Sequence, residues 1–78
     1  MVNNEDNYTD ISAYGLLHLL RETVGARRKS KIPPTRSTVY SAFHGDESEL
    51  TPLQKLIVKT GREILSVHEK EIETLQPA

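Results

Sequence analysis

The stretch TPLQKLIVKTGREILSV, residues 51–67, decides the fold that the sequence predicts. Its first four residues form a capping box, because the side chains of Thr51 and Gln54 can each accept a hydrogen bond from the other's backbone N–H. Proline between them suits the first position of a helix. Nothing except Gly61 interrupts the helical pattern before Pro77, so we expect a helix over residues 52–75, about 36 Å long at 1.5 Å per residue. Its core stripe consists of Leu53, Leu56, Ile57, Thr60, Ile64 and Val67.

A second apolar stripe runs along the same predicted helix. Positions 58, 65 and 72 are spaced by seven residues, and positions 61, 68 and 75 follow each of them by three. This a/d heptad pattern is typical of helices that pair with another helix. In the alternative interpretation, the stripe only widens the face that contacts the domain's own first helix. We favour a homodimer whose interface consists of Val58, Leu65, His68, Ile72 and Leu75.

A first, shorter helix is expected near the N-terminus, over residues 10–24. Thr9 or Asp10 would be its N-cap, and Gly25 would end it in a left-handed conformation. Residues 1–9 lack apolar periodicity and predict a flexible acidic arm. The expected helix has an apolar stripe formed by Ala13, Leu16, Leu17, Leu20 and Val24.

A second short helix is expected over residues 35–44. Thr35 follows two prolines and is a typical N-cap, and Gly45 is placed to end the helix. Its inner side carries Val39, Ala42 and Phe43. Together with the helix over residues 52–75, these elements predict an all-α fold: a compact three- to four-helix domain, residues 10–78, with a long C-terminal helix.

The composition agrees with one small globular domain. The chain has 78 residues, of which 36% are hydrophobic and 27% charged, and it has no cysteine to form a disulfide or a thiolate metal site. No apolar run approaches the roughly 20 residues of a membrane span, and the acidic N-terminus is unlike a signal peptide. We therefore expect a cytoplasmic protein that does not bind a membrane.

Positive charge is concentrated in one segment, residues 21–36. It holds six basic residues and one acidic residue, a charge of +5, whereas the other 62 residues hold four basic and ten acidic residues, a charge of −6. A basic patch on an acidic protein favours binding to a polyanion or to an acidic protein.

Residues 34–45, PTRSTVYSAFHG, are similar to the second half of the helix-turn-helix in phage-repressor and Cro-like regulators. In that family, a small-polar and basic stretch opens the recognition helix, an aliphatic residue anchors it, and a glycine closes it before the next helix. The resemblance spans residues 34–65 and gives the predicted fold a helix-turn-helix-like middle. The basic segment 26–32 before it is either a very short first helix of the motif or a basic loop beside the recognition helix.

The resemblance implies a small sequence-specific DNA-binding transcriptional regulator of the repressor kind found in phages and plasmids, a dimer on a palindromic operator. Side chains on the outer face of the recognition helix would read base edges in the major groove. These are Arg36, Ser37, Tyr40, Ser41 and His44. A second set, at the start of that helix and in the basic segment, would bind DNA phosphates. Its members are Arg27, Arg28, Lys29, Lys31 and Thr38.

The alternative is a protein–protein interaction module that binds an acidic partner through the basic segment and the heptad stripe. The sequence argues against an enzyme and predicts neither a cofactor nor a metal site. His18, His44 and His68 lie on three different segments without ligand spacing. There is also no Gly-rich phosphate loop and no cysteine nucleophile.

Overall fold

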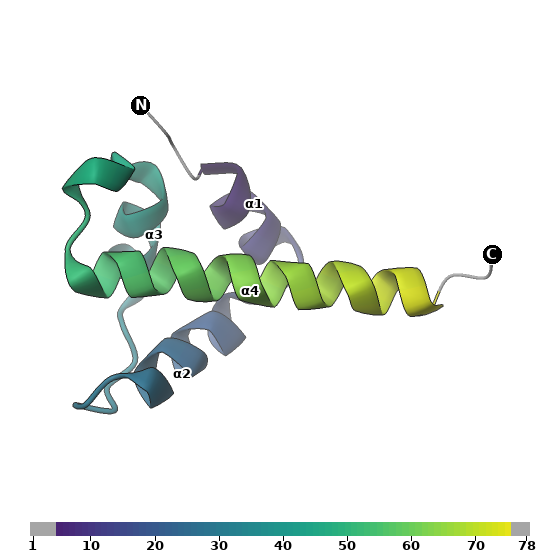
Figure 1. The fold of residues 1–78 in the computed structure, drawn as a ribbon, viewed down its shortest axis with the longest axis horizontal. Helices are drawn as coiled ribbons and strands as arrows, with labels where there is room; N and C mark the ends of the chain where they lie inside the picture. The colour runs from purple at the N-terminus through teal and green to yellow at the C-terminus, as the bar shows by residue number, and fades with distance from the viewer. Residues whose placement is uncertain (1–4, 76–78) are drawn as a thin grey trace.

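Helix α4 contacts each of the other three α-helices. The computed structural model describes residues 5–75, which fold in order as α1 (Glu5–Ala13), α2 (Leu17–Arg27), α3 (Arg36–His44), the 3-10 turn η1 (Glu47–Glu49) and α4 (Pro52–Leu75). Figure 1 shows α1 and α3 on one side of α4 and α2 on the other. Helices α1 and α3 also pack against each other. All regular elements of the described residues are helical, so the predicted all-α class is confirmed.

The two helices predicted with clear caps have the expected bounds. The Thr51 N–H donates to Gln54 Oε1 at 2.9 Å, and the Gln54 N–H donates to Thr51 Oγ1 at 3.2 Å, which is the predicted capping box. Helix α4 then continues for 24 residues. At the start of α3, the side chain of Thr35 accepts a hydrogen bond from the Thr38 N–H at 3.2 Å.

The single helix predicted over residues 10–24 is wrong, because α1 and α2 are separated at Gly15. This residue has a φ of 69°, in the left-handed region. The Leu16 N–H donates to the Ile11 carbonyl at 2.8 Å, and the Gly15 N–H donates to the Ser12 carbonyl at 3.3 Å. These are the two hydrogen bonds of a Schellman motif, which ends a helix at a left-handed glycine. Helical spacing of apolar residues continues across the break, so periodicity alone did not reveal it.

The helix before this break begins earlier than expected. Because α1 starts at Glu5, residues 5–9 of the predicted flexible arm are helical, and neither Thr9 nor Asp10 is an N-cap. Residues 1–4 lie outside the described residues. Helix α1 turns Ile11 into the core with no exposed surface, whereas Ala13 of the predicted stripe is exposed.

Gly25 does not end a helix, contrary to the prediction. It is buried within α2, which continues to Arg27. A Cβ atom on Gly25 would lie 3.0 Å from the backbone nitrogen of Pro33 and 3.1 Å from its Cα. The glycine therefore lets the loop after α2 fold back closely over the helix.

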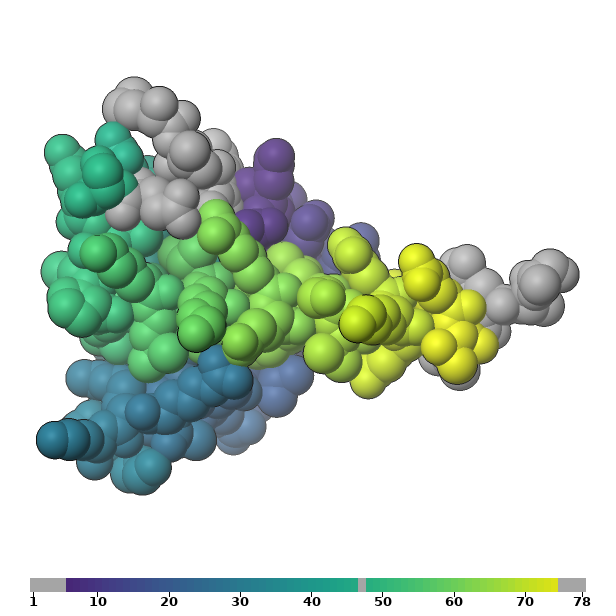
Figure 2. Space-filling model, viewed as in Figure 1, coloured from purple at the N-terminus to yellow at the C-terminus, as the bar shows by residue number. Residues whose placement is uncertain are grey.

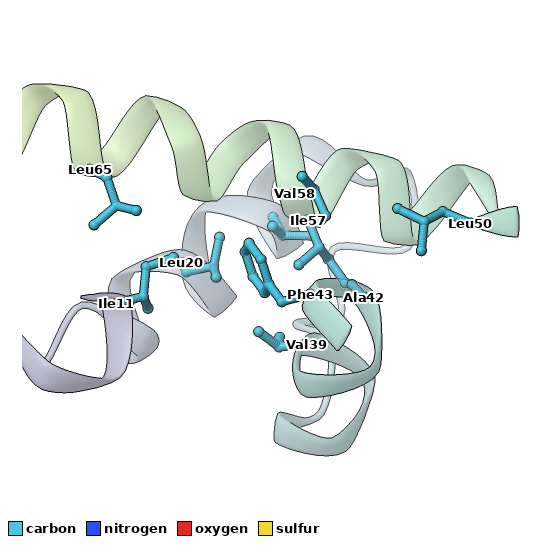
Figure 3. Packing of buried hydrophobic residues seen from close by; sticks show 10 residues of the cluster. Ile11, Leu20, Val39, Ala42, Phe43, Leu50, Ile57, Val58 and Leu65 are labelled. Carbon is cyan, nitrogen blue, oxygen red and sulfur yellow. The ribbon is translucent and has the colours of Figure 1, made fainter. Parts of the chain in front are cut away.

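The core lies where α1, α2 and α3 meet the first half of α4 (Figure 3). Gly61 of α4 faces two of its side chains, because a Cβ atom there would lie 2.7 Å from Phe43 Cζ and 2.9 Å from Ile11 Cδ1. The buried hydrophobic residues are Ile11, Leu20, Val24, Val39, Ala42, Phe43, Leu50, Ile57, Val58 and Leu65. The prediction that Val39, Ala42 and Phe43 face inward is confirmed.

The expected heptad interface is wrong in its first half. Val58 and Leu65 are only 2% and 8% exposed, because the chain's own helices cover them. The alternative interpretation, a wide apolar face that packs within the domain, describes this half of α4. His68 is half-buried and lies against Tyr14, with ring centroids 4.7 Å apart. Ile72 remains 36% exposed, and the side chain of Leu75 lies outside the described part of the structure.

None of the helices between residues 5 and 75 combines the length and the apolar character needed to cross a bilayer.

Replacing Gly61 by alanine should destabilise the protein although alanine is the better helix former. We expect the free energy of unfolding to fall by up to about 2 kcal/mol, because overpacking a buried site costs roughly 1–3 kcal/mol, against a gain in helix propensity of about 1 kcal/mol. Urea unfolding followed by circular dichroism measures the change. Ser66→Ala, at an exposed position of the same helix, is the matched control and should change stability little. A Gly61→Ala protein as stable as the parent would contradict the close packing.

Candidate nucleic-acid interface

The first half of α3 presents an exposed polar surface. Three buried side chains attach this nine-residue helix to the core, and its other side faces outward. Of the five residues predicted to read bases, four are exposed: Arg36, Ser37, Tyr40 and Ser41. Tyr40 retains 48% of its surface. The structure therefore brings these four onto one side of a short helix, as expected.

The second half of this face packs against α1. The rings of Tyr40 and His44 are stacked, with centroids 3.9 Å apart and an interplanar angle of 22°. Tyr8 of α1 meets them edge-on, at 5.2 Å from the Tyr40 ring and 5.6 Å from the His44 ring. His44 is half-buried in this cluster. His44 is therefore less able to reach a base edge than the exposed residues one or two turns earlier on α3.

Thr38 has a structural role at the start of α3. Its hydroxyl lies 2.9 Å from the Thr35 hydroxyl, and its backbone N–H donates to the same Thr35 oxygen. The backbone N–H and the hydroxyl of Thr38 are thus both already engaged with Thr35 at the N-cap. This residue is less suited to phosphate binding than the sequence indicates.

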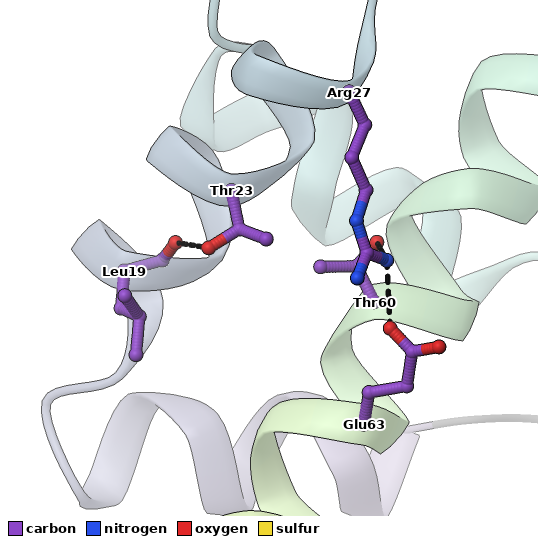
Figure 4. Close-up of polar contacts among 5 residues, drawn as sticks. All are labelled: Leu19, Thr23, Arg27, Thr60 and Glu63. Atoms are coloured by element: carbon purple, nitrogen blue, oxygen red, sulfur yellow. Dashed lines mark hydrogen bonds and ion pairs between the residues drawn. The ribbon is translucent and has the colours of Figure 1, made fainter.

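Arg27 is held by α4 (Figure 4). Its Nη1 donates to Thr60 Oγ1 at 3.0 Å and to Glu63 Oε2 at 2.6 Å. The side chains of Arg27 and Glu63 are 43% and 46% exposed. A carboxylate already neutralises this guanidinium, so Arg27 is a poor phosphate ligand compared with the other members of the predicted set.

The basic segment after α2 is a loop, which resolves the choice between a short helix and a loop. Helix α2 extends through Arg27, and residues 28–35 contain no further helix. Two cations fold this loop by bonding to carbonyl oxygens: Arg28 Nη1 donates to Ile32 O at 2.8 Å, and Lys31 Nζ donates to Ala26 O at 2.6 Å. Carbonyl groups carry no net charge, so both side chains keep their positive charge on the surface.

Arg21, which the sequence analysis counted in the basic segment but did not include among the predicted DNA-binding residues, also lies beside the start of α3. Its Nε donates to the carbonyl of Pro34 at 2.9 Å and so links α2 to the start of α3. A surface hollow of about 300 Å³ lies beside it. Arg21 and Arg36 both line this hollow, together with Ser12, Gly15, Leu17 and His18. The two arginines are 15 positions apart in the sequence, and the fold of the intervening loop brings them together.

Glu22, the acidic residue that follows Arg21 in α2, already contacts a histidine. Glu22 Oε1 lies 3.1 Å from His18 Nε2, four residues earlier on the same helix. Arg36 and Lys29 are exposed, and neither forms a hydrogen bond or an ion pair with the described residues. Arg21 and Arg36 thus line one hollow beside the start of α3, and no carboxylate is among the described residues that line it.

The fold also differs from a tight helix-turn-helix. Helix α2 packs on α4 rather than forming a close pair with α3, and the eight-residue basic loop 28–35 separates the two helices. No protein-family model matches this chain, and neither a curated protein nor a solved structure is significantly similar to it. The resemblance to phage-repressor and Cro-like regulators stays an interpretation of residues 34–65.

The aromatic contact of Tyr8 predicts a measurable role for α1 in holding α3. Tyr8→Leu keeps an apolar side chain but removes the edge-on ring contacts with Tyr40 and His44. We expect the free energy of unfolding to fall by about 0.5–1.5 kcal/mol. Thermal and urea unfolding measure this loss. Tyr8→Phe retains the ring and serves as the control, and equal losses in the two variants would argue against the ring contacts.

Proposed function

We propose that this protein binds double-stranded DNA, with the exposed first half of α3 in the major groove. The observation that supports this most is the gathering of Arg21 and Arg36 at the N-terminal end of α3. A helix N-terminus carries partial positive charge, so placing cations there lowers stability unless an anion is present. Local arrangements that oppose folding in this way are expected at functional sites.

A DNA backbone supplies the missing anion. Arginine binds phosphate oxygens with two parallel hydrogen bonds, and lysine contributes as a point charge. Arg21 and Arg36 would hold phosphates on either side of the inserted helix end, and Arg28, Lys29 and Lys31 would lie along the adjoining backbone. The acidic remainder of the chain would repel DNA and so restrict contact to this surface.

Sequence preference would come from the short polar side chains on α3. Ser37, Ser41 and the Tyr40 hydroxyl can donate to or accept from base edges in the major groove. We keep the predicted function of a transcriptional regulator. Arg36 lies beside Arg21 at the same hollow, so we now assign it to phosphate binding instead of base reading.

Salt-dependent binding tests the phosphate contacts. Fluorescence anisotropy of a labelled duplex should show an affinity that falls steeply between about 50 and 200 mM salt. Arg21→Ala and Arg36→Ala should each reduce the slope of log K against log salt by about 0.9, the amount expected for one phosphate contact. Arg27→Ala should leave the slope unchanged, because Glu63 already neutralises that side chain.

Two outcomes would contradict this assignment. If the slope falls for Arg27→Ala as much as for the other two variants, the contacts are not those of the proposed surface. If the parent protein shows no DNA binding at low salt, the basic surface faces an acidic protein instead, as in the alternative prediction.

Conservative changes on α3 test base reading. Tyr40→Phe keeps the stacked ring and removes only the hydroxyl, and Ser37→Ala and Ser41→Ala each remove one hydroxyl. After selection of a preferred site from random duplexes, at least one variant should lose preference at a defined base pair, by about 1–3 kcal/mol of discrimination. His44→Gln is the comparison, because that ring packs against Tyr8. Unaltered preference in all three hydroxyl variants would mean that α3 does not read bases.

A further inference from the structure

The loop between α2 and α3 exposes an apolar side chain among its cations. Ile32 is 62% exposed, the largest exposed fraction of any large hydrophobic residue that the structure describes. Its neighbours in the loop include Arg28, Lys29 and Lys31. Figure 2 shows this part of the chain at the tip of the blue lobe, at the lower left and below the start of α4. An isoleucine in this position contributes little to the domain's own core.

A strained residue precedes this isoleucine. Lys31 has a φ of 58°, and it is the only residue other than glycine with a positive φ in the described part of the chain. The left-handed conformation brings the Cβ atom of an L-residue close to the following carbonyl oxygen, so residues other than glycine rarely adopt it. Strain of this kind persists only where surrounding contacts enforce it, and it clusters at functional sites. The turn at Lys31 therefore favours a functional role for Ile32, the residue that it places.

Hydrogen bonds around Lys31 close the loop. Its backbone N–H donates to the Arg28 carbonyl at 3.2 Å, and its Nζ donates to the Ala26 carbonyl at 2.6 Å. Arg28 Nη1 donates to the Ile32 carbonyl at 2.8 Å, and the Ile32 N–H donates to Ser30 Oγ at 3.4 Å. Both backbone polar groups of Ile32 thus have partners within the loop. Because neither would be left unpaired, this residue can be buried against a partner at little cost in hydrogen bonds.

Two prolines attach the base of the loop to α2. Pro33 lies against the helix at Gly25, and Pro34 is buried with its carbonyl hydrogen-bonded to an arginine of α2. A proline fixes its own φ, and the residue before it is pushed toward extended backbone. No turn or helix occurs over residues 32–35. Four extended steps span about 12 Å at 3.1 Å per residue, so Ile32 lies at roughly this distance from the start of α3.

We propose that Ile32 inserts into the minor groove of DNA, beside the major groove that receives α3, and bends the duplex. This inference rests on the proposed function, because α3 sets the position of the loop on the DNA. One turn of B-DNA is about 34 Å long, so the neighbouring minor groove lies about 17 Å from the centre of the major groove. The extended link from α3 to Ile32 covers most of this offset, and the isoleucine side chain supplies the rest.

The chemistry of the loop suits a minor groove. Proteins that bind there combine Arg and Lys with apolar side chains such as isoleucine, which enter between base pairs, partly unstack them and kink the duplex. The cations of the loop would meet the phosphates that border the groove. A TA step unstacks easily, and it lacks the amino group that guanine places in the minor groove. The expected target is therefore a TA step beside the site that α3 reads.

A membrane surface is a less suitable partner for this loop. Anionic lipids would also attract its cations, but membrane binding scales with the apolar area that is buried, and a single isoleucine offers little. The short link to α3 also places Ile32 near Arg36, at the surface proposed to bind DNA. Charge and position together favour DNA.

Loss of DNA bending in an uncharged variant tests this proposal. A duplex that carries the preferred site, a flanking TA step and a dye at each end reports bending as energy transfer between the dyes. The parent protein should raise the transfer efficiency above that of the free duplex. Ile32→Ser should leave it close to the value of the free duplex, whereas Ile32→Leu should bend the DNA as the parent does. Ile72→Ser, which changes an exposed isoleucine of α4, is the matched control and should also keep the bend.

Salt dependence separates this proposal from the function on which it rests. Ile32→Ser removes no charge, so the variant should still bind DNA with an affinity that falls steeply with salt. If the parent protein does not bind DNA even at low salt, both proposals are wrong. If Arg21→Ala and Arg36→Ala reduce the salt slope as expected but Ile32→Ser bends DNA like the parent, only the insertion of Ile32 is wrong.

Inosine substitution identifies the groove. Replacing the A·T pairs of the flanking step by G·C adds an amino group to the minor groove and should reduce the bend. Replacing them by inosine·C should restore it, because inosine lacks that amino group and leaves the minor groove as in A·T. Equal bending of all three duplexes, or equal loss with G·C and inosine·C, would overturn the proposal. Binding of the parent protein to phosphatidylserine vesicles that Ile32→Ser abolishes would overturn it as well, and would assign the loop to a membrane.

Discussion

The close approach at Gly61 is the constraint on which the other contacts depend. Because this residue has no side chain, the Phe43 ring and the end of Ile11 reach the backbone of α4 at a single point. Helices α3 and α1 are therefore attached to the same turn of α4, one through each side chain. A glycine inside a helix lowers helix propensity, and here that loss is offset by the burial of two large apolar side chains.

The position of the candidate interface follows from this attachment. Once α3 lies on α4, its three inward side chains fix which residues face out, and α1 brings Tyr8 against the later half of the outer face. The link from Arg21 to the Pro34 carbonyl then sets the start of α3 relative to α2. Each of these contacts orients the polar surface before any ligand arrives, which reduces the ordering cost of binding.

Helix α2 separates the basic surface beside α3 from an apolar groove that lies between α2 and α4. Arg21 and Thr23 are two residues apart, which corresponds to about 200° around a helix. The first belongs to the basic surface beside α3, and the second lines the apolar groove against α4. Leu20 and Val24 lie between them in the core. The basic surface and the groove therefore lie on different sides of α2.

The sequence predicted the elements whose signals are local and missed those that depend on distant contacts. The capping box at Thr51 and the N-cap at Thr35 involve side chains three residues from the groups they satisfy, so both helices had the expected starts. The break at Gly15 was not predicted, because a glycine in the middle of an apolar pattern and a glycine at its end look alike in the sequence. The predicted heptad interface was wrong in its first half, because periodicity cannot show which part of a wide apolar stripe the domain itself covers.

Pairing between remote residues accounts for the changes in the candidate site. Arg27 and Glu63 are 36 positions apart, so their ion pair could not be inferred from spacing. The meeting of Arg21 with Arg36 depends on how the loop closes, which in turn depends on the contact between Gly25 and Pro33. Exposure along α3 was predictable, since it needs only the period of a helix and the three apolar residues that anchor it.

The order of the helices along the chain has a consequence for synthesis on the ribosome. Helices α1, α2 and α3 have nine, eleven and nine residues, and isolated helices shorter than about 12–15 residues are marginal in water. The surface on which all three are buried comes last, in α4. A nascent chain would therefore hold residues 5–50 largely unfolded until α4 leaves the exit tunnel, and would then fold in one late cooperative step.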